Sequence, residues 1–515
     1  AGCLVTLHRG RLIYPKWWFA FIVFPLVVIV NGVVTEGNAP IIWFFRQAYL
    51  LGGLAFVLAL LQFQINQRVL DQCIFVLIIA FGLHSLLGMA QVYSPGLIPQ
   101  YFHSLNDFVP RGIFQQINAQ ASFLATGLVV TLYFISRPSF RCANRVVQSV
   151  VVITFTSALY IVVASGSRIG LLSLIIAIPL VVWSRFHQLK SHKTLLLILV
   201  LSSCGGFIAG QVGLHETIDK TTQLTEKSYS TARVTMYTIG MELVAKEPIY
   251  GYGIGGFLKA WNLQASDFVL RHPEASLPQY VTHPHNETLF WMIEAGLPAL
   301  FGILVFVIVT CLALYQCGFQ RGGAYAAMLL PISLHTQVEL PFYISSLHWF
   351  LWLFLIYLVL RRYTKTAVFN LSLSMRRLIQ IASVSFPIGV TLFMVSTAHA
   401  QLDLYDFFYK KNKQAPYLEL ALDNVYTKNM AEQILMSAIL YSSIENGDES
   451  TVETFEDWAL NYVVTRPELK MYQDLVSASI FLRPEGKGCD AIIAGLKMYG
   501  HNKPFKLAYE KCKQK

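Results

Sequence analysis

A chain of 515 residues is long enough for two or more soluble domains, but 55% of its residues are hydrophobic, only 13% are charged, and the mean hydropathy is +0.51. This composition excludes an ordinary water-soluble protein and indicates a polytopic membrane protein. The formal net charge of +10 does not indicate nucleic-acid binding, because Lys and Arg fall mostly in short segments between apolar runs, where they determine topology. The eight cysteines show no CxxC or Cys/His spacing typical of a metal site.

Eleven apolar runs in the chain are each long enough to cross a bilayer, which takes about 17–25 residues. The first begins at Trp17 and continues to Val34 without the small-residue cleavage pattern of a signal peptide, so we expect it to remain as an anchor. We therefore predict an all-α membrane protein of about eleven transmembrane helices. The runs lie near residues 17–34, 41–61, 73–91, 113–135, 146–165, 168–184, 194–214, 297–316, 324–340, 343–360 and 378–398.

Basic residues cluster in one alternating set of the loops between these runs. By the positive-inside rule, that set of loops is cytoplasmic. The opposite short connections hold almost no basic residues apart from Arg111 and Arg168. The N-terminus is therefore predicted inside and, because the helix count is odd, the C-terminal region outside. The clustered residues are Arg9, Arg11, Lys16, Arg68, Arg137, Arg141, Arg145, Arg185, Lys190, Lys193, Arg321, Arg361, Arg362, Lys365, Arg376 and Arg377.

The predicted outer face carries the unusual polar residues of the chain. Arg111 and Arg168 lie there against the topology rule, so their charges call for a role other than orientation. Glu339 stands at the outer end of an apolar run, where an ionisable group at membrane depth suggests function. The alternative is a structural ion pair between Glu339 and one of these arginines. The outer face consists of residues 92–112, 165–168 and 215–296, the turn at Pro341 and everything after about His399.

The outer polar residues are organised around the sequence Thr-His-Pro-His-Asn-Glu in the long outer loop. Pro284 suits the first turn of a helix, where its missing N–H costs nothing, and Asn286 or Thr288 can satisfy the free backbone donors there. A helix is therefore predicted to begin here. Its unpaired N–H groups and its dipole would place His283 and His285 where an anionic head group can dock. The alternative is that the two histidines only cap the helix or lie in a loop.

The long outer loop also contains a cluster of glycines, Gly251, Gly253, Gly255 and Gly256. Glycines permit tight turns and close approach of the backbone to another group. No strand precedes this cluster and no Gly-Lys-Ser/Thr follows it, which excludes a phosphate-binding loop of the Walker or Rossmann type. We predict a plain turn.

From about His399 the chain changes to amphipathic helices separated by turn signals. Paired short helices are typical of small helical-repeat modules, although no repeat period is clear here. We predict a transmembrane domain over residues 1–398, which includes the outer loop 215–296, and a helical recognition domain outside the membrane over residues 399–515. Cys489 and Cys512 lie in this second domain, and we predict that they form a disulfide in an oxidising compartment.

A combination of histidine, arginine and carboxylate side chains on the outer face, without metal-site spacing, suits a lipid-linked pyrophosphate. Arginine offers a permanently charged fork for phosphate oxygens as charge develops on the leaving group. A neutral imidazole can take a proton from an acceptor hydroxyl at physiological pH. Because no ATP is available outside the membrane, the donor must carry its own activation. The residues therefore predict a glycosyltransferase that uses a polyprenyl-linked glycosyl pyrophosphate.

The chain resembles the O-antigen ligase and polymerase superfamily over residues 1–398, and most closely its bacterial protein O-oligosaccharyltransferase branch, whose extra C-terminal region the soluble tail resembles. A weaker stretch, His335-Thr336-Gln337-Val338-Glu339-Leu340-Pro341, departs from the family pattern because a tyrosine is expected at Leu340; Tyr343 is a nearby substitute. The order and shared sidedness of the short motifs make the resemblance specific. Four stretches carry it: Gln116-Ile117-Asn118 after Arg111-Gly112; Gly166-Ser167-Arg168-Ile169-Gly170; Arg233 followed by Glu247-Pro248-Ile249-Tyr250-Gly251-Tyr252-Gly253; and His283-Pro284-His285-Asn286 ending in Glu294-Ala295-Gly296.

The resemblance implies roles for individual residues. His285 directly precedes Asn286, as in the family's His-Asn pair, and is expected to be the essential histidine and the base toward the acceptor hydroxyl. His283 is its rival for that role, or its supporting partner. The other implied site residues are Arg168 and Arg233 for the pyrophosphate, Gln116 for positioning donor or acceptor, Glu339 for orienting an arginine or His285, and Arg111, Asn286 and Tyr343 as further substrate contacts.

The same resemblance implies transfer of an assembled oligosaccharide from undecaprenyl pyrophosphate to a Ser or Thr of a periplasmic protein such as a pilin. The chain would lie in the inner membrane of a Gram-negative bacterium, with a cytoplasmic N-terminus and with its site and C-terminus in the periplasm. Neither a cofactor, a metal site nor a nucleic-acid partner is expected, although a divalent ion stays open.

Two other acceptors would use the same donor chemistry. A ligase would transfer the glycan to lipid A core, and a polymerase would extend the glycan itself. The folded tail favours a protein acceptor, because it adds recognition surface that a lipid acceptor does not need. A lipid or glycan transporter is a minor alternative, since the polar residues lie at outer helix ends rather than near the bilayer midplane and no internal repeat is visible.

Overall fold

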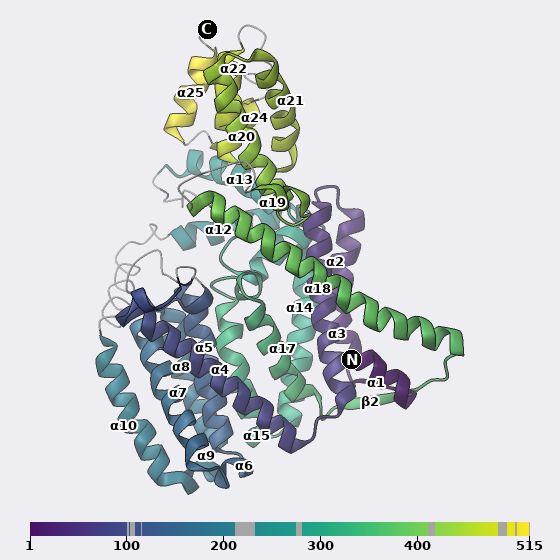
Figure 1. The fold of residues 1–515 in the computed structure, drawn as a ribbon, viewed down its shortest axis with the longest axis vertical. Helices are drawn as coiled ribbons and strands as arrows, with labels where there is room; N and C mark the ends of the chain where they lie inside the picture. The colour runs from purple at the N-terminus through teal and green to yellow at the C-terminus, as the bar shows by residue number, and fades with distance from the viewer. Residues whose placement is uncertain are drawn as a thin grey trace.

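The computed structural model describes residues 1–99, 102, 109–114, 116–211, 232–273, 275, 281–409, 418–482, 492–499 and 502–513. Within these residues the regular structure is helical except for one pair of short strands. A broad bundle of helices fills the lower part of the molecule, and a narrower group of helices stands above it (Figure 1). The described structure therefore agrees with the predicted all-α class.

Helix α5 (Ile117–Ile135) forms the centre of one half of the bundle. Every residue from Ala119 to Ile135 is buried, because four helices pack against α5: α4 (Gln67–Tyr93), α7 (Arg145–Ala164), α8 (Arg168–Ser184) and α15 (Phe319–His335). Helix α10 (Lys193–Ala209) packs on the outside of α7. Short elements complete this half: η1 (Pro95–Leu97), η3 (Gly112–Phe114), α6 (Pro138–Arg141), α9 (Phe186–Leu189) and η4 (Lys190–His192).

The other half of the bundle is built from α2 (Trp18–Val34), α3 (Pro40–Phe63), α14 (Glu287–Gln316) and α17 (Ser346–Leu360). Helix α14 packs along α2, and α17 packs between α3 and α15. Helix α14 bends at Gly296, whose φ is 71°. At one end of this half, after α1 (Gly2–Arg9), strand β1 (Arg11–Pro15) pairs antiparallel with β2 (Thr364–Val368), with Arg11 opposite Val368.

A small group of helices covers the end of the bundle at which α14 begins. Helices α12 (Ala232–Lys246) and α13 (Phe257–Arg271) share an apolar core with the first turns of α14, to which Met236, Trp261 and Phe290 contribute. The short helix α16 (Pro341–Ile344) connects α15 to α17 beside them. Residues 215–231, the first part of the predicted outer loop 215–296, lie outside the described residues.

The glycine cluster forms a structural turn that clamps the bend of α14. The Tyr252 N–H donates to the carbonyl of Ile293 (2.9 Å), and the Leu297 N–H donates to the carbonyl of Pro248 (2.7 Å). Gly251 has a φ of +63°, and a Cβ there would lie 2.6 Å from the Ile293 carbonyl oxygen. The turn predicted from the sequence is therefore present, and its glycines serve close backbone packing.

The C-terminal helices form their own core above the bundle. Helix α18 (Leu373–Tyr409) runs diagonally across the front of the molecule and leads into them (Figure 1). Their core contains Phe455, Tyr472 and Phe505, and α24 packs on α13, where the Asn262 side chain donates to the Tyr499 hydroxyl (2.7 Å). These helices are α19 (Glu419–Asp423), α20 (Lys428–Asn446), α21 (Glu449–Thr465), α22 (Leu469–Phe481), α24 (Ile493–Tyr499) and α25 (Lys503–Lys513).

Two expectations for this part of the chain, the domain boundary and the disulfide, stay predictions. Helix α18 passes residue 398 without a break, so no chain irregularity marks the expected domain boundary there. Cys489 lies outside the described residues, as does the side chain of Cys512, and the predicted disulfide falls on both.

Each of the eleven expected spans overlaps a helix of the structure. Among the described residues, seven helices are long and apolar enough to cross a membrane, and three more apolar helices, α2, α8 and α17, are shorter. This confirms a multi-pass membrane protein, while the count of eleven crossings stays a prediction. The seven are residues Pro40–Phe63, Gln67–Tyr93, Ile117–Ile135, Arg145–Ala164, Phe186–Ala209, Glu287–Gln316 and Leu373–Tyr409.

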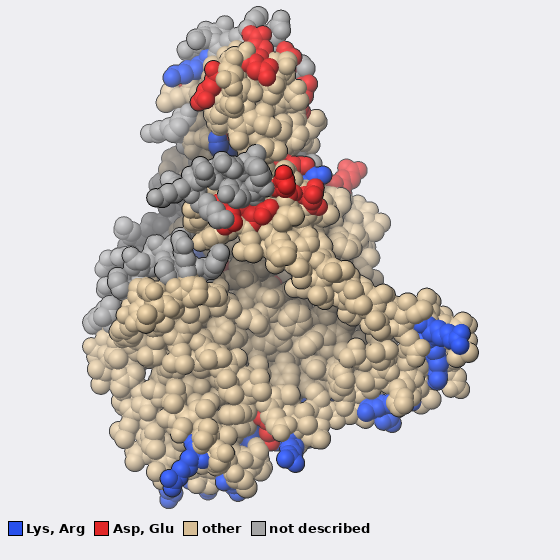
Figure 2. Space-filling model, viewed as in Figure 1, with Lys and Arg blue, Asp and Glu red and all other residues tan. Residues whose placement is uncertain are grey.

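Charged side chains are distributed unevenly over the surface. On the face shown in Figure 2, Lys and Arg gather along the lower edge of the bundle, and Asp and Glu gather over the C-terminal helices and the end of α18. The apolar middle between them carries almost no charge on this face. A membrane protein with cytoplasmic basic loops and a C-terminal domain on the other side has this distribution, and the orientation itself stays a prediction.

We predict that Gly251→Ala destabilises the protein by about 1–3 kcal/mol, because the new Cβ meets a backbone carbonyl in a left-handed conformation. Thermal unfolding of the detergent-solubilised protein, followed by tryptophan fluorescence, measures the effect. Gly205→Ala on α10 is the matched control, since no atom lies within 4 Å of a Cβ there. Equal melting temperatures for the two variants would contradict the clamp.

Candidate functional site

The histidine segment lies where the start of α14 meets the end of α15. Helix α14 begins at Glu287, with Asn286 as its N-cap: the Asn286 side chain accepts a hydrogen bond from the Leu289 N–H (2.8 Å). The same side chain donates to the carbonyl of Gln337 (3.0 Å). The predicted helix start is thus confirmed within a few residues, but the placement of Pro284 in its first turn was wrong. Pro284 precedes the cap, because both histidines lie in the irregular segment that ends at Asn286.

A hydrogen bond between His285 and Glu339 forms the centre of the site. The His285 Nδ1 and a Glu339 carboxylate oxygen lie 2.8 Å apart. Glu339 is buried, with only 5% of its surface exposed. Arg233, from the first turn of α12, lies 3.8 Å from the same carboxylate oxygen. The arginine that pairs with Glu339 is therefore Arg233, where the sequence suggested Arg111 or Arg168.

The backbone at His285 is held in an unusual conformation. Its φ is +50°, in the left-handed region that residues other than glycine rarely adopt. The His285 N–H donates to the His283 Nδ1 (3.2 Å), and the Tyr237 hydroxyl donates to the His285 carbonyl (3.2 Å). The two imidazole rings meet edge to face with centroids 4.4 Å apart. Such strained positions persist only where surrounding contacts hold them, and they concentrate at functional sites.

His285 and Glu339 together are called the dyad below. The charged groups around this dyad determine its protonation. Burial alone would raise the pKa of Glu339, but the hydrogen bond with His285 and the positive charge of Arg233 lower it below its ordinary value. Burial lowers the pKa of His283, and its neighbour His285 lowers it further. At neutral pH Glu339 is therefore ionised and His283 is neutral. An ionised Glu339 accepts the Nδ1–H of His285, which leaves the Nε2 of His285 with a free lone pair that can accept a proton.

A second arginine approaches the dyad from the turn between α7 and α8. Arg168 is the first residue of α8 and lies close enough to Arg233 for the two guanidinium charges to interact. Ser167 caps α8 by accepting from the Gly170 N–H (3.2 Å), and its hydroxyl donates to the Asn118 side chain (2.8 Å). The structure thus brings the second, third and fourth motifs of the resemblance toward one place, and it ties the first motif to the second through Asn118.

The remaining predicted site residues lie around the contact between His285 and Glu339 and not within it. Gln116 precedes α5, and its side-chain oxygen is buried without a hydrogen-bond partner in the described structure; the same holds for the Nε of Arg111 near η3. Tyr343 lies on α16, with the Arg46 guanidinium carbon 4.9 Å above its ring. Tyr343 therefore faces Arg46 on α3 and belongs to a neighbouring cavity.

Sequence reasoning missed three residues beside the site. Arg46 forms an ion pair with the fully buried Glu294, and a basic residue inside an apolar run is a signal that could have identified it. Glu287 is nine-tenths buried, and its Oε2 has no hydrogen-bond partner in the part of the chain described here. Tyr237 supports the His285 backbone, and no sequence pattern distinguished it from other helix residues.

One group of side chains in the described structure has the composition of a metal site. The ligand atoms of His283, His285 and Glu339 all lie within 4.8 Å of one another. Two histidines and a carboxylate are a ligand set that catalytic zinc uses. Two of these atoms are already engaged, however, because the His285 Nδ1 bonds Glu339 and the His283 Nδ1 accepts from a backbone N–H. The arrangement fits an oriented base better than a vacant coordination sphere.

The fold and the site together define a class: a multi-pass membrane protein with an imidazole–carboxylate pair and two arginines where transmembrane helices end. Comparison with known families narrows this class. Residues 150–304 match the family model described as O-antigen ligase, and residues 324–506 match the one described as virulence factor membrane-bound polymerase, C-terminal. His285 falls in the first match and Glu339 in the second. No curated protein matches the chain.

The two matches support a membrane glycosyltransferase similar to the O-antigen ligases and polymerases, the superfamily predicted from the motifs. That superfamily implies a lipid-linked glycan donor and a membrane-associated acceptor. The protein-modifying branch, the nature of the acceptor and the roles of individual residues stay predictions.

The carboxylate of Glu339 is expected to stabilise the folded protein only while it is ionised. Its lowered pKa means that this stabilisation is present above the ordinary value of 4.5 and is lost as pH falls through the lower value in the folded protein. We predict that Glu339→Gln lowers the melting temperature at pH 7 and that the difference from wild type shrinks below pH 4.5.

The control for this titration is Glu453→Gln, which changes an exposed carboxylate on α21. It should leave the melting temperature close to that of wild type at both pH values. A Glu339→Gln deficit that is independent of pH would mean that the side chain contributes by packing and not by charge.

Proposed function

We propose that this chain is an O-linked oligosaccharyltransferase, which moves an oligosaccharide as one block from undecaprenyl pyrophosphate to a Ser or Thr of a periplasmic protein such as a pilin. The observation that carries the proposal is the 2.8 Å contact between His285 and the buried Glu339, with Arg233 beside it. The contact supplies an oriented base, and the arginine supplies positive charge for a phosphate group.

The proposed reaction has one proton transfer and one displacement. The Nε2 of His285 removes the proton from the acceptor hydroxyl, and the hydroxyl oxygen attacks the anomeric carbon of the first sugar. The bond between that carbon and the pyrophosphate oxygen breaks, and the lipid pyrophosphate leaves with the electron pair. Arg233 and Arg168 stabilise the negative charge that develops on it. The donor supplies the activation, so no nucleotide is required.

Glu339 acts through His285 in this scheme. Its carboxylate holds the Nδ1–H, which directs the Nε2 toward the acceptor, and it stabilises the imidazolium that forms after proton transfer. Asn286 and Tyr237 hold the backbone that presents the imidazole, and His283, neutral and in contact with His285, completes the support. We assign no step to a metal ion, because His285 and the two arginines account for both the proton transfer and the displacement.

A protein acceptor is supported by the C-terminal helices. They form a separate core and touch the catalytic part through α24 and α13, close to the outer helices that frame the site. Their surface is rich in acidic side chains on the face shown in Figure 2. A folded surface of this size beside the site offers recognition for another protein, whereas a lipid acceptor would reach the site through the membrane.

A second candidate is a polymerase that extends a lipid-linked glycan. It is favoured by the match of residues 324–506 to a membrane-bound polymerase, which covers Glu339 and most of the C-terminal helices. The same donor site and base would serve it. A ligase to lipid A core is favoured in the same way by the match of residues 150–304.

We predict that His285→Ala lowers transfer roughly 10²–10⁴-fold, the usual contribution of a general base, without loss of folded protein. The assay uses the purified chain, an undecaprenyl-linked oligosaccharide and one of three acceptors: a pilin-like protein, lipid A core or a second lipid-linked glycan. Mass spectrometry identifies the acceptor that gains the glycan.

The control is His399→Ala, which removes an exposed histidine on α18. Modification of the pilin-like protein, lost in His285→Ala and kept in His399→Ala, supports the proposal. Transfer only to lipid A core or to a glycan would identify the ligase or polymerase instead. Unchanged transfer by His285→Ala would contradict the assignment of the base.

A further inference from the structure

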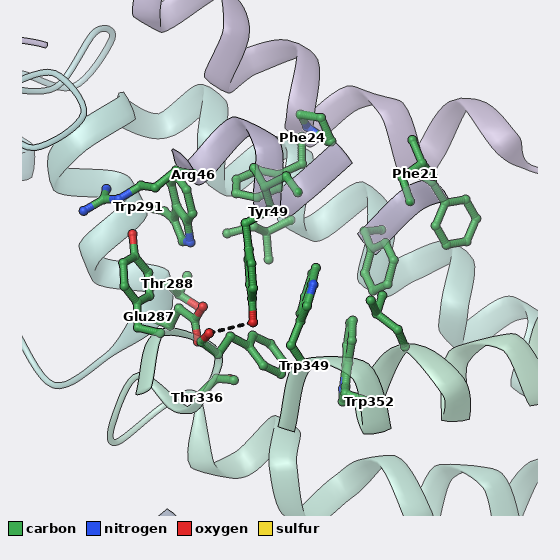
Figure 3. A pocket seen from close by; sticks show the side chains of 18 of the residues that line it. Phe21, Phe24, Arg46, Tyr49, Glu287, Thr288, Trp291, Thr336, Trp349 and Trp352 are labelled. Atoms are coloured by element: carbon green, nitrogen blue, oxygen red, sulfur yellow. Dashed lines mark hydrogen bonds between the residues drawn. The ribbon is translucent and has the colours of Figure 1, made fainter. Parts of the chain in front are cut away.

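A large apolar cavity lies in the half of the bundle built from α2, α3, α14 and α17. Its volume is about 670 Å³, within the range of about 300–1,000 Å³ that is typical of ligand sites. Aromatic rings make up much of its wall: Phe21, Phe24, Tyr49, Trp349 and Trp352 line it, and Figure 3 shows these residues arranged around it. The wall offers stacking and dispersion contacts to a hydrocarbon and few hydrogen bonds.

Several polar side chains of this cavity lie together at one end. Figure 3 shows Arg46, Glu287, Thr288 and Thr336 on one side and Trp352 and Phe21 on the other. Among the described residues, the Oε2 of Glu287 and the Nε of Arg46 are buried without hydrogen-bond partners. Buried polar groups are seldom left unpaired in folded proteins. The Nε1 of Trp349, on the wall of the cavity, is a further buried donor without a partner in the described structure. A head group with hydroxyl groups and phosphate oxygens would satisfy such groups.

The polar end is continuous with the candidate site. Thr288 and Gln337 line the cavity, and both belong to the segments that hold the dyad: Asn286 donates to the Gln337 carbonyl, and Thr288 follows two residues later in the first turn of α14. An amphipathic molecule with its chain in the cavity would therefore present its head group at the start of α14, where His285 stands.

An apolar helix lies beside the cavity. Helix α18 crosses in front of this half of the bundle (Figure 1), and the apolar stretch that qualifies it as a membrane span is entirely unburied. Its Phe393 stacks on Phe45 of α3 (centroids 5.8 Å apart), and Phe45 lines the cavity. An apolar helix that packs so little against the bundle leaves space for hydrocarbon chains beside α3.

We propose that this cavity binds the polyprenyl chain of the glycan donor, next to its pyrophosphate, and so sets the preference of the enzyme for long-chain donors. The proposal rests on the proposed function, because it takes the donor to be a lipid-linked glycan. The aromatic wall recognises the unsaturated chain, and the polar end receives the phosphate that is attached to that chain. Arg233 and Arg168 receive the rest of the pyrophosphate, and the first sugar follows beyond it.

The test fills the cavity and varies the chain of the donor. Leu50→Trp on α3 and Ile303→Trp on α14 place an indole in the cavity that both residues line. The matched controls are Leu51→Trp and Leu304→Trp, which change the adjacent, exposed residues of the same helices, outside the cavity lining. Transfer is measured with one glycan on either an undecaprenyl chain or a chain of two isoprene units.

We expect Leu50→Trp and Ile303→Trp to raise the KM for the undecaprenyl donor at least tenfold, roughly the loss of burial of two methylene groups, and to leave the short-chain donor unaffected. The two controls should behave like wild type with both donors. Equal effects of the cavity variants on both donors, or no effect on the long one, would overturn the proposal. If wild type used neither donor, the proposed function would fail first, so the two failures are distinguishable.

Discussion

The hydrogen bond between His285 and Glu339 is the interaction on which the site depends. It joins residues 54 positions apart in the sequence and connects the segment before α14 to the end of α15. Because His285 has a positive φ, its ring reaches Glu339 only while Tyr237, His283 and the Asn286 cap hold the chain in place. The outer helices α12 and α13 and the glycine turn that clamps α14 therefore serve this one contact. In the proposed reaction, this contact gives the imidazole that acts as base a defined direction.

Burial shifts the pKa of Glu339 in one direction, the hydrogen bond and neighbouring positive charge shift it in the other, and together these two outweigh burial. Desolvation would favour a neutral Glu339, yet Arg233 and the hydrogen bond keep its pKa low. Arg168 lies near Arg233, so positive charge is concentrated beside this contact, which favours an anionic donor. On the other side of the first turn of α14, Arg46 is paired with Glu294 and faces an aromatic cavity. The beginning of α14 thus separates a region suited to phosphate from a region suited to hydrocarbon, as a lipid-linked pyrophosphate requires.

Much of the fold could be predicted because apolar runs of membrane length have few alternatives to helix. The site could be predicted in part: Glu339 stood out as an ionisable residue in an apolar run, and His285 and the arginines stood out through their motifs. The pairing of Glu339 with His285 was one of two options, and its partner arginine was Arg233, because pairing follows from the packing of α12, α14 and α15. The sequence did not reveal the cavity, since its lining residues are spread over many helices, from α2 to α20, and most of them look like ordinary residues of apolar helices. Arg46 is a basic residue inside an apolar run, and the positive-inside analysis of the loops did not use that signal.

The most direct test of the central claim is a double-mutant cycle on kcat/KM for glycan transfer, with His285→Ala, Glu339→Gln and the combined variant. If Glu339 acts only by orienting and stabilising the imidazole, Glu339→Gln slows the wild-type enzyme and has no further effect once His285 is alanine. That result is the one expected from the 2.8 Å contact. Independent effects that multiply in the double variant would show that the two residues act separately, and would contradict a functional pair.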